Sequence, residues 1–526
     1  MREIVKNSFY LLSIVYTIAV VIISLKIISR YTLHFEILAI IIGTFGISIV
    51  AKEQDSMGTN MKLEKFPLIL LIFLGSIFIV ITRIVPYLNN SIPLGYDAGL
   101  YKYGIEYGLE NLDRWILRGG MEPGFLYLMK PLTFILTTEF ILKWLFIGFC
   151  LVLGFSVYLT GTAYFGKRVG IIAFLIYGIS VVQYKVFSFM YYKNIIGLSL
   201  MMFALYFLKK ETKYAGICFI IISGMLGAVH RPTFYLFGLS YLLYVFLAPL
   251  IEKKKYEKSW LAHHGKNAFF ILIITSLFYI GKFRPAIIEI ISPVLGGFLN
   301  PGESPGTFIS FHTYQFAILP YLPFAILGFF YLVKKKEYNI IQFWAVISAI
   351  IVYFQFFFYN RFIIHLDMAL IILAAVGFSV FINNKKVFGT SILVAMILSS
   401  SILVTREARE VKPLIDEEAL QLIEKLDARV EKDAKIMALS SEHAPWVLGY
   451  AKRKTIAPGL FDENLWGKDE WGRFWQLSEE EKEKTKKMLE VYGTPLYMFS
   501  GTRIFNNPCF EVFLEEGRNR VYKYVC

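Results

Sequence analysis

The densest cluster of polar side chains in the apolar part of the chain is SIPLGYDAGLYKYGIEYG, Ser91 to Gly108. Within it, Asp97 follows Gly95 and Tyr96 at what the pattern predicts to be the junction between a loop and a helix. A carboxylate there accepts hydrogen bonds from the free amides of the first helical turn, so Asp97 is a candidate N-cap. The same position suits a general base that deprotonates a hydroxyl, and Tyr101 lies one turn further on the same face. The residues alone leave both interpretations of Asp97 open.

A second group of ionisable side chains lies in FFFYNRFIIHLDMALIILAAVGF, where Arg361 enters an otherwise apolar segment from one end. His365 follows one helical turn below it, and Asp367 lies deeper. Ionisable groups inside a membrane span are unfavourable, so these residues are candidates for function. The planar guanidinium of Arg361 suits a phosphate, which it binds through charge-assisted hydrogen bonds. The alternative is an arginine that reaches the membrane surface, with Asp367 as its buried partner.

Two shorter segments carry weaker signals. AVHRPTF places His230 and Arg231 at another helix end, where a lone arginine is more often a membrane anchor and a histidine is usually satisfied by its neighbours. GGMEPGFLYLMKPL has Pro123 and Pro131 on either side of an apolar stretch, which predicts a helix lying at the membrane surface.

Composition identifies the kind of protein that must position these residues. The chain has 526 residues, of which 56% are hydrophobic and 18% are charged, and its mean hydropathy is +0.56. The apolar residues form blocks of roughly 17–25, the length that crosses a bilayer as a helix. The formal charge of +14 lies in short links between blocks, where lysine and arginine orient helices, so no nucleic-acid partner is expected. Some of these cations are expected to meet membrane lipids.

About 13 transmembrane helices are predicted, followed by a small α/β domain. Their expected ranges are 7–29, 32–51, 66–86, 139–163, 169–187, 194–209, 214–230, 232–250, 267–283, 314–333, 339–358, 363–381 and 387–404. The basic links agree with one alternating topology, in which the N-terminus is cytoplasmic and 87–138 is an outer loop with interfacial helices. The chain therefore divides into a transmembrane domain, 1–404, and an extracytoplasmic domain, 405–526, in a multi-pass protein of the cell membrane.

The last residues of the chain predict a hairpin. CFEVFL and RVYKYVC flank the turn EEGRN, and pairing Leu514 with Val521 places Cys509 opposite Cys526. An extracytoplasmic location permits oxidation, so a disulfide between these cysteines is expected. The alternative is two unpaired thiols, since a register is easily shifted by one residue.

Taken together, these segments resemble the GT-C superfamily of membrane glycosyltransferases. GYDAGLY places Asp97 where the family has an aspartate in its first large outer loop. MEPGFLYL is similar to the His-Pro-Pro-Leu-Tyr run of protein mannosyltransferase-like and aminoarabinose transferase-like members, with Glu122 and Pro123 in place of His and Pro. YNRFIIHLDMALIILAAVGF is similar to a late family helix that begins Arg-Tyr-Leu-Leu-Pro.

The chain departs from the family pattern at two places. Two spans precede the helix that leads to Asp97, where the family usually has one. The outer link near Phe187 to Asn194 lacks the second acidic residue of several members and has Lys193 instead. A metal site would lack ligands there, so neither a cofactor nor a divalent ion is expected.

The resemblance implies an inverting transfer of sugar from a polyprenyl- or dolichyl-phosphate-linked donor to a hydroxyl of a glycan, lipid or protein. Asp97 is then the base, and Arg361 binds the phosphate with help from Arg231 or Lys102. The substrate-binding residues implied in this way are completed by Tyr101, Glu122 and His365.

Two alternatives remain. One is a lipid-linked glycan polymerase or ligase, and the other is a transporter or flippase. The sequence shows no pair of Gly/Pro-broken spans in matching halves, the pattern typical of transporters with inverted repeats.

Overall fold

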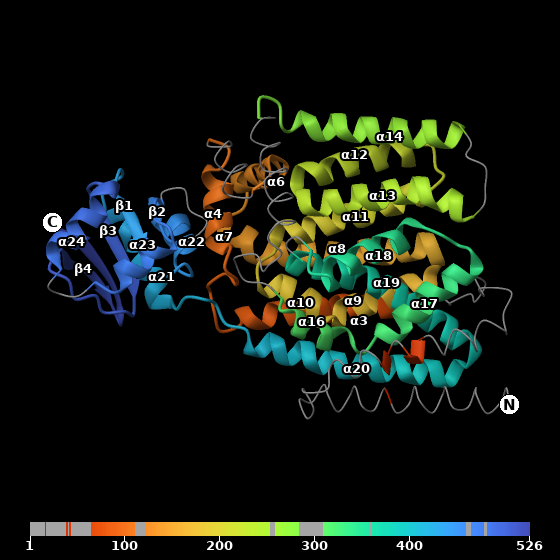
Figure 1. Cartoon of the computed structure of the whole chain (residues 1–526). Coiled ribbons are helices and arrows are strands. Elements are labelled where there is room, and N and C mark those ends of the chain that lie inside the picture. The colour runs from red at the N-terminus through yellow and green to blue at the C-terminus, as the bar shows by residue number, and fades with distance from the viewer. Residues whose placement is uncertain are drawn as a thin grey trace.

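A computed structural model describes residues 16, 38, 39, 41–43, 65–110, 121–252, 258–282, 309–356, 359–458, 464–477 and 481–526. Figure 1 shows a large bundle of helices with a smaller domain, built around a sheet, at one end. The predicted spans 7–29 and 32–51 lie almost entirely outside the described residues. The same holds for most of 284–313, the link between the predicted spans 267–283 and 314–333.

The helical part follows the predicted blocks closely. Its helices are α3 (Lys65–Ile84), α4 (Ala98–Tyr107), α6 (Pro123–Met129), α7 (Thr138–Phe140), α8 (Phe146–Phe165), α9 (Lys167–Ile179), α10 (Val181–Ser188), α11 (Tyr192–Lys209), α12 (Ala215–Val229), α13 (Arg231–Ile251), α14 (Lys258–Leu277), α16 (Phe311–Ile318), α17 (Leu322–Lys335), α18 (Ile340–Tyr353), α19 (Tyr359–Asn384) and α20 (Lys386–Glu410). Each predicted range from 66–86 onward falls on one of these helices or on a bent pair of them. The segment Met121–Thr137 does not span, because its α-helix α6 has only 7 residues.

Among the described residues, 5 helices are long and apolar enough to cross a membrane, or up to 7 if each bent pair is one span. Helices α9 and α10 meet at 53°, and helices α16 and α17 meet at 75°. Ser180 ends α9 and caps α10 through its hydroxyl, which accepts a hydrogen bond from the Gln183 amide. The cap at Ser180 produces the first of these bends without a proline, whereas Pro320 lies at the second bend.

Helix α19 forms the centre of the bundle, where it lies beside α9, α17 and α18 (Figure 1). Gly328 of α17 and Gly377 of α19 face each other so closely that a Cβ on Gly377 would lie 1.9 Å from a backbone oxygen. Phe324 stacks on Phe378 with the ring centroids 3.7 Å apart. This close packing fixes the helix that carries Arg361.

The C-terminal part is the predicted α/β domain. Its elements are α21 (Glu417–Arg429), β1 (Lys435–Ala438), α22 (Ala444–Trp446), β2 (Lys454–Ile456), α23 (Lys468–Trp475), α24 (Lys482–Leu489), β3 (Leu496–Gly501), β4 (Phe510–Glu516) and β5 (Asn519–Tyr524). The sheet order is β2-β1-β3-β5-β4, with β1 parallel to both neighbours and β5 antiparallel to both of its own. The preceding helix α20 continues past the expected domain boundary at 404 to Glu410.

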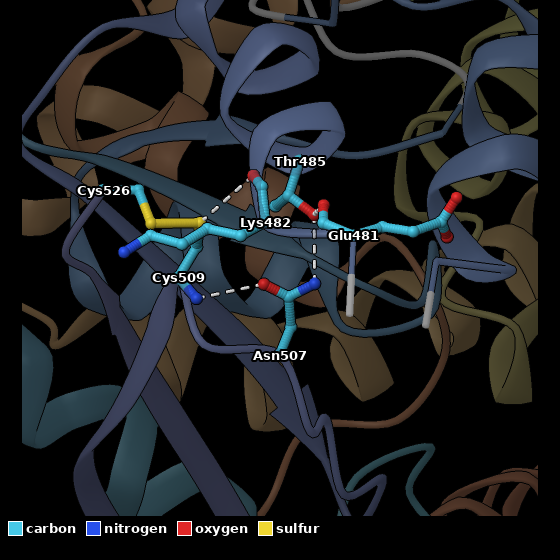
Figure 2. Close-up of a disulfide and its surroundings, with 6 residues drawn as sticks. All are labelled: Glu481, Lys482, Thr485, Asn507, Cys509 and Cys526. Carbon is cyan, nitrogen blue, oxygen red and sulfur yellow. Dashed lines mark hydrogen bonds between the residues drawn. A yellow bond between two sulfur atoms is a disulfide. The ribbon is translucent and has the colours of Figure 1, made fainter. Parts of the chain in front are cut away.

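The terminal hairpin contains the expected pairs Leu514–Val521 and Glu515–Arg520, followed by a register shift between Val512 and Leu514. Cys509 and Cys526 are nevertheless joined in a disulfide, with their Cα atoms 5.0 Å apart (Figure 2). Asn507 connects this end of the hairpin to α24, because its side chain accepts from the Cys509 amide and donates to Thr485.

Removal of this disulfide is expected to destabilise the C-terminal domain. The bond joins residues separated by 17 positions, and a loop of that size corresponds to about 3 kcal/mol of stabilisation through the unfolded state. Cys526→Ser should therefore lower the temperature at which the domain unfolds in the detergent-solubilised protein. Cys218→Ser, a change at a free cysteine in α12, is the matched control and should leave that temperature unchanged. Equal unfolding temperatures for Cys526→Ser and the wild type would contradict this stabilising role.

Candidate functional site

Asp97 lies in the turn that leads into α4. Gly95, with φ +77°, allows the chain to pass close to the link between α10 and α11, and a Cβ there would lie 2.5 Å from the carbonyl carbon of Phe189. The backbone carbonyl of Asp97 accepts the first helical hydrogen bond, from Tyr101, at 2.8 Å. Its side chain makes no capping hydrogen bond. The carboxylate is thus not used as an N-cap in this structure.

Two cations from distant parts of the chain act on this carboxylate. Burial raises the pKa of Asp97, while the positive charges of Lys193 and Arg361 lower it. Burial likewise raises the pKa of Tyr101, the charges of Asp97 and Glu122 raise it further, and the charge of Arg361 lowers it. Because these electrostatic effects need proximity, α4, α11 and α19 bring their charged residues to one place, which we call the Asp97 cluster (Asp97, Tyr101, Glu122, Lys193, Arg231 and Arg361).

Glu122, at the start of α6, anchors two of these cations. Its side chain is 2% exposed, and its carboxylate lies 2.8 Å from Lys193 Nζ and 3.5 Å from Arg231 Nε. The backbone amide of Arg231 also donates to it at 3.2 Å. Burial favours the neutral acid, but the charges of Lys193, Arg231 and His230 outweigh it and lower the pKa of Glu122 to about 2. Glu122 is therefore ionised and holds Lys193 in place.

A chain of hydrogen bonds ends at the backbone carbonyl of Arg361. His365 Nδ1 lies 3.3 Å from the carbonyl oxygen of Arg361, and Thr233 Oγ1 lies 2.7 Å from His365 Nε2 and 2.6 Å from His230 Nδ1. A carbonyl only accepts, so His365 donates from Nδ1, and in its neutral form accepts the Thr233 proton at Nε2. The Thr233 oxygen then accepts from His230. His365 is 0% exposed and uses both nitrogens inside the protein, so it supports Arg361 and does not face a substrate.

Lys102, for which the resemblance implies a role in phosphate binding, forms ion pairs with two other carboxylates. Its ammonium lies 2.8 Å from Glu106 and 2.6 Å from Glu139, and 5.0 Å from the centre of the Tyr450 ring. Two carboxylates already balance its single charge. The structure therefore does not bring Lys102 into the Asp97 cluster.

The C-terminal domain packs directly on the helix that follows Asp97. Figure 1 shows α4 and α22 side by side where the two parts meet. A Cβ on Gly99 would lie 2.1 Å from the Pro445 oxygen, and one on Gly449 would lie 2.2 Å from the Gly99 oxygen. Burial raises the pKa of Tyr96, and the charges of Asp97 and Glu442 raise it further. The Asp97 cluster thus borders the C-terminal domain.

Asp367 is not the partner of Arg361. Its carboxylate accepts hydrogen bonds from Ser180, Gln183 and Tyr321, all of them neutral. The alternative of a surface arginine paired with a buried aspartate therefore does not describe this helix.

Sequence reasoning did not select Lys193 or Thr233 for the site. Lys193 was noticed only as the residue at the place of a missing acid, although a basic residue in the first turn of an outer helix was itself a signal. Thr233 gave no signal, because an apolar helix accommodates a threonine without any functional partner.

The Asp97 cluster holds more positive than negative side chains. Among the described residues, no three His, Cys, Asp or Glu side chains are grouped so that they could hold an ion. Three cations, Lys193, Arg231 and Arg361, accompany the two carboxylates of Asp97 and Glu122. The cluster therefore carries a surplus of positive charge, which favours an anion.

Comparison with known proteins identifies solved structures that share this fold. No protein-family model matches the chain, and no curated protein matches it in sequence. The archaeal oligosaccharyltransferase AglB from Archaeoglobus fulgidus, solved with an inhibitory peptide and a dolichol-phosphate, superposes with a TM-score of 0.60 at 14% identity, over 84% of this chain and 70% of that one. The same enzyme with Zn and sulfate gives 0.53 at 15% identity, over 82% and 68%.

ArnT from Cupriavidus metallidurans, bound to undecaprenyl phosphate, gives a TM-score of 0.54 at 11% identity, over 87% of this chain and 98% of that chain. Identities this low establish the fold alone. Each of these matches nevertheless covers more than four fifths of this chain. The fold that the resemblance implied is thereby confirmed, and this membrane protein has the fold of the AglB and ArnT structures.

Proposed function

We propose that the chain is a glycosyltransferase that moves a sugar from a polyprenyl-phosphate-linked donor to a hydroxyl of its acceptor, with inversion. The observation that supports this proposal is that the charges of Lys193 and Arg361 act on the Asp97 carboxylate, with Lys193 held 2.8 Å from Glu122, so that a base lies near an anion site. The structures with the same fold were solved with a dolichol-phosphate and with undecaprenyl phosphate, which is the class of lipid that such an anion site would take.

Each charged residue of the Asp97 cluster has its own role in the proposed reaction. Asp97 accepts the proton of the acceptor hydroxyl as its oxygen attacks the anomeric carbon. The bond between that carbon and the phosphate oxygen breaks, and the electron pair leaves with the phosphate. Arg361 and Lys193 stabilise the charge that develops on this leaving group, while Glu122 holds Lys193 in place before the substrate arrives.

The reaction is proposed to take place on the extracytoplasmic side. The basic links Lys167–Arg168, Lys209–Lys213, Lys334–Lys336 and Lys385–Lys386 lie at the opposite ends of their helices from the Asp97 cluster. Cytoplasmic links are richer in lysine and arginine, so the cluster and the C-terminal domain belong outside. The disulfide of that domain agrees with an oxidising compartment.

Transfer is proposed to need no divalent ion, because Lys193 supplies positive charge beside Asp97. We expect the purified protein to keep its full rate after dialysis against EDTA, and added Mg²⁺, Mn²⁺ or Zn²⁺ to produce no increase. Initial rates across an EDTA and metal series test this directly. A rate that falls with EDTA and returns with one of these metals would contradict it.

The proposed activity is tested with the purified protein in liposomes. Donors with radiolabelled sugars on undecaprenyl or dolichyl phosphate are supplied together with glycan, lipid and peptide acceptors. Labelled acceptor with one added sugar and the opposite anomeric configuration supports the proposal. Long chains of repeating units would instead indicate a polymerase.

A transporter is the second candidate, and the two bent span pairs are the observation that favours it, since broken spans line the binding sites of many transporters. The same liposomes distinguish the two functions. Movement of the labelled donor across the bilayer without any labelled acceptor would indicate a flippase and would overturn the transferase.

A further inference from the structure

Both bent span pairs are tied to one buried carboxylate. Asp367, in the middle of α19, is 0% exposed. One of its oxygens accepts hydrogen bonds from Gln183 Nε2 at 2.7 Å and from Ser180 Oγ at 3.0 Å. The other accepts from the hydroxyl of Tyr321. No side chain of this network belongs to the Asp97 cluster.

The partners of Asp367 lie at the bends themselves. Ser180 is the residue between α9 and α10, and Tyr321 immediately precedes α17 at the second bend. Gln183, in the first turn of α10, also donates to the Ile364 carbonyl of α19 at 3.2 Å. At a bend, the helix axis before and after the break can point in different directions. Hydrogen bonds at the bend therefore fix the direction of the helix that follows.

That segment leads to the site. Helix α10 ends at a turn in which Met190 has φ +59°, a left-handed conformation that persists only where its surroundings hold it. The turn packs against Gly95, two residues before Asp97, and α11 then begins with Lys193 in its first turn. The direction of α10 therefore sets the relative positions of Asp97 and Lys193.

We propose that Asp367 is a positioning residue for the transfer reaction, which holds α10 and α17 against α19 so that Lys193 and Arg361 meet Asp97. It acts through hydrogen-bond geometry and not through its charge. This inference rests on the proposed function, since the reaction it serves is the sugar transfer.

Two substitutions separate geometry from charge. In Asp367→Asn, the amide oxygen accepts from Ser180 and Gln183, and the amide nitrogen donates to the Tyr321 hydroxyl, which accepts as readily as it donates. Asp367→Leu removes all three of these hydrogen bonds, while Gln183 keeps its bond to the Ile364 carbonyl. We expect Asp367→Asn to keep most of kcat, and Asp367→Leu to lose about 10²-fold in kcat, the effect of displacing reacting groups by about 1 Å. Equal losses in both variants would overturn the geometric role, and full kcat per folded molecule in Asp367→Leu would overturn the positioning role.

The second measurement is a double-mutant cycle that tests whether the effect of Asp367 on kcat depends on Lys193. If Asp367 acts by placing Lys193, the loss caused by Asp367→Leu should largely disappear in a Lys193→Gln background, because the effect of the Lys193 charge on Asp97 is already gone. Fully additive losses would contradict the proposal. Two other variants replace Asp367→Leu in the same cycle if that variant does not fold. Tyr321→Phe removes one hydrogen bond to Asp367, and Ser180→Ala removes another together with the cap of α10.

Hydrogen exchange supplies a readout that does not depend on activity. The amides of residues 189–195 should exchange faster in Asp367→Leu than in the wild type or in Asp367→Asn, while those of α24 should not change. Unchanged exchange in 189–195 would overturn the positioning role. If exchange changes as expected but the wild-type protein shows no sugar transfer, the proposed function fails and the structural link remains.

Discussion

Asp97→Asn is expected to abolish sugar transfer while the protein still folds and inserts. The asparagine keeps the shape of the side chain but has no basic oxygen to accept the acceptor proton, and general-base assistance is typically worth about 10²–10⁴-fold. Folding should be unaffected, because the Asp97 side chain makes no capping hydrogen bond to the α4 backbone. Initial rates with the labelled donor give the size of the loss.

The matched control is Asp469→Asn, which removes an exposed carboxylate from α23. Its rate should equal that of the wild type. Donor binding to Asp97→Asn, measured by retention of undecaprenyl phosphate, should persist, because Arg361 and Lys193 remain. An Asp97→Asn protein that turns over like the wild type would refute the role of Asp97.

The pH dependence follows from the same group. A general base works only when deprotonated, and burial raises the pKa of Asp97 above the ordinary value of an aspartate. The rate should therefore fall as the pH falls through this raised pKa. Lys193 lowers the pKa of Asp97, so Lys193→Gln should move the acid limb to higher pH. A limb that stays in place or moves to lower pH would contradict this electrostatic link.

Helix positions could be predicted well because hydrophobic blocks of membrane length have one structural solution. The pairing of Leu514 with Val521 could be predicted because side-chain alternation fixes a hairpin's faces. The bend at Ser180 could not be predicted, because it depends on a serine that caps an internal helix end and on Asp367 from a distant helix. The local sequence pattern does not identify a hydrogen-bond partner on a distant helix.

The candidate site divides in the same way. Asp97 and Arg361 could be selected singly, because an acid at a helix start and an arginine in an apolar helix are unusual on their own. Their neighbours were misjudged, since the contact that decides each role is tertiary. Lys102 is neutralised by Glu139, from a different segment, and His365 is buried against Thr233. Glu122 gains its role from Lys193 and Arg231, which come from other segments.

Arg361→Ala is expected to give the other large loss. The guanidinium is the cation of α19 that acts on Asp97, and in the proposed reaction it stabilises the phosphate as it leaves. Removing one preorganised donor to a developing anion typically lowers kcat by about 10²–10³-fold. The fold should survive, because His365 is held by the backbone carbonyl of Arg361 and not by its side chain.

Graded substitution separates charge from shape at this position. Arg361→Lys keeps the charge but loses the planar fork, so its rate should lie between those of Arg361→Ala and the wild type. Arg406→Ala, which removes an exposed arginine paired with Glu410, is the control and should leave the rate unchanged. The loss in Arg361→Ala should also appear as weaker retention of undecaprenyl phosphate, an assay that involves no sugar. If Arg361→Ala binds this lipid and turns over as the wild type does, the phosphate lies elsewhere, and the pairing of this guanidinium with Asp97 serves another purpose.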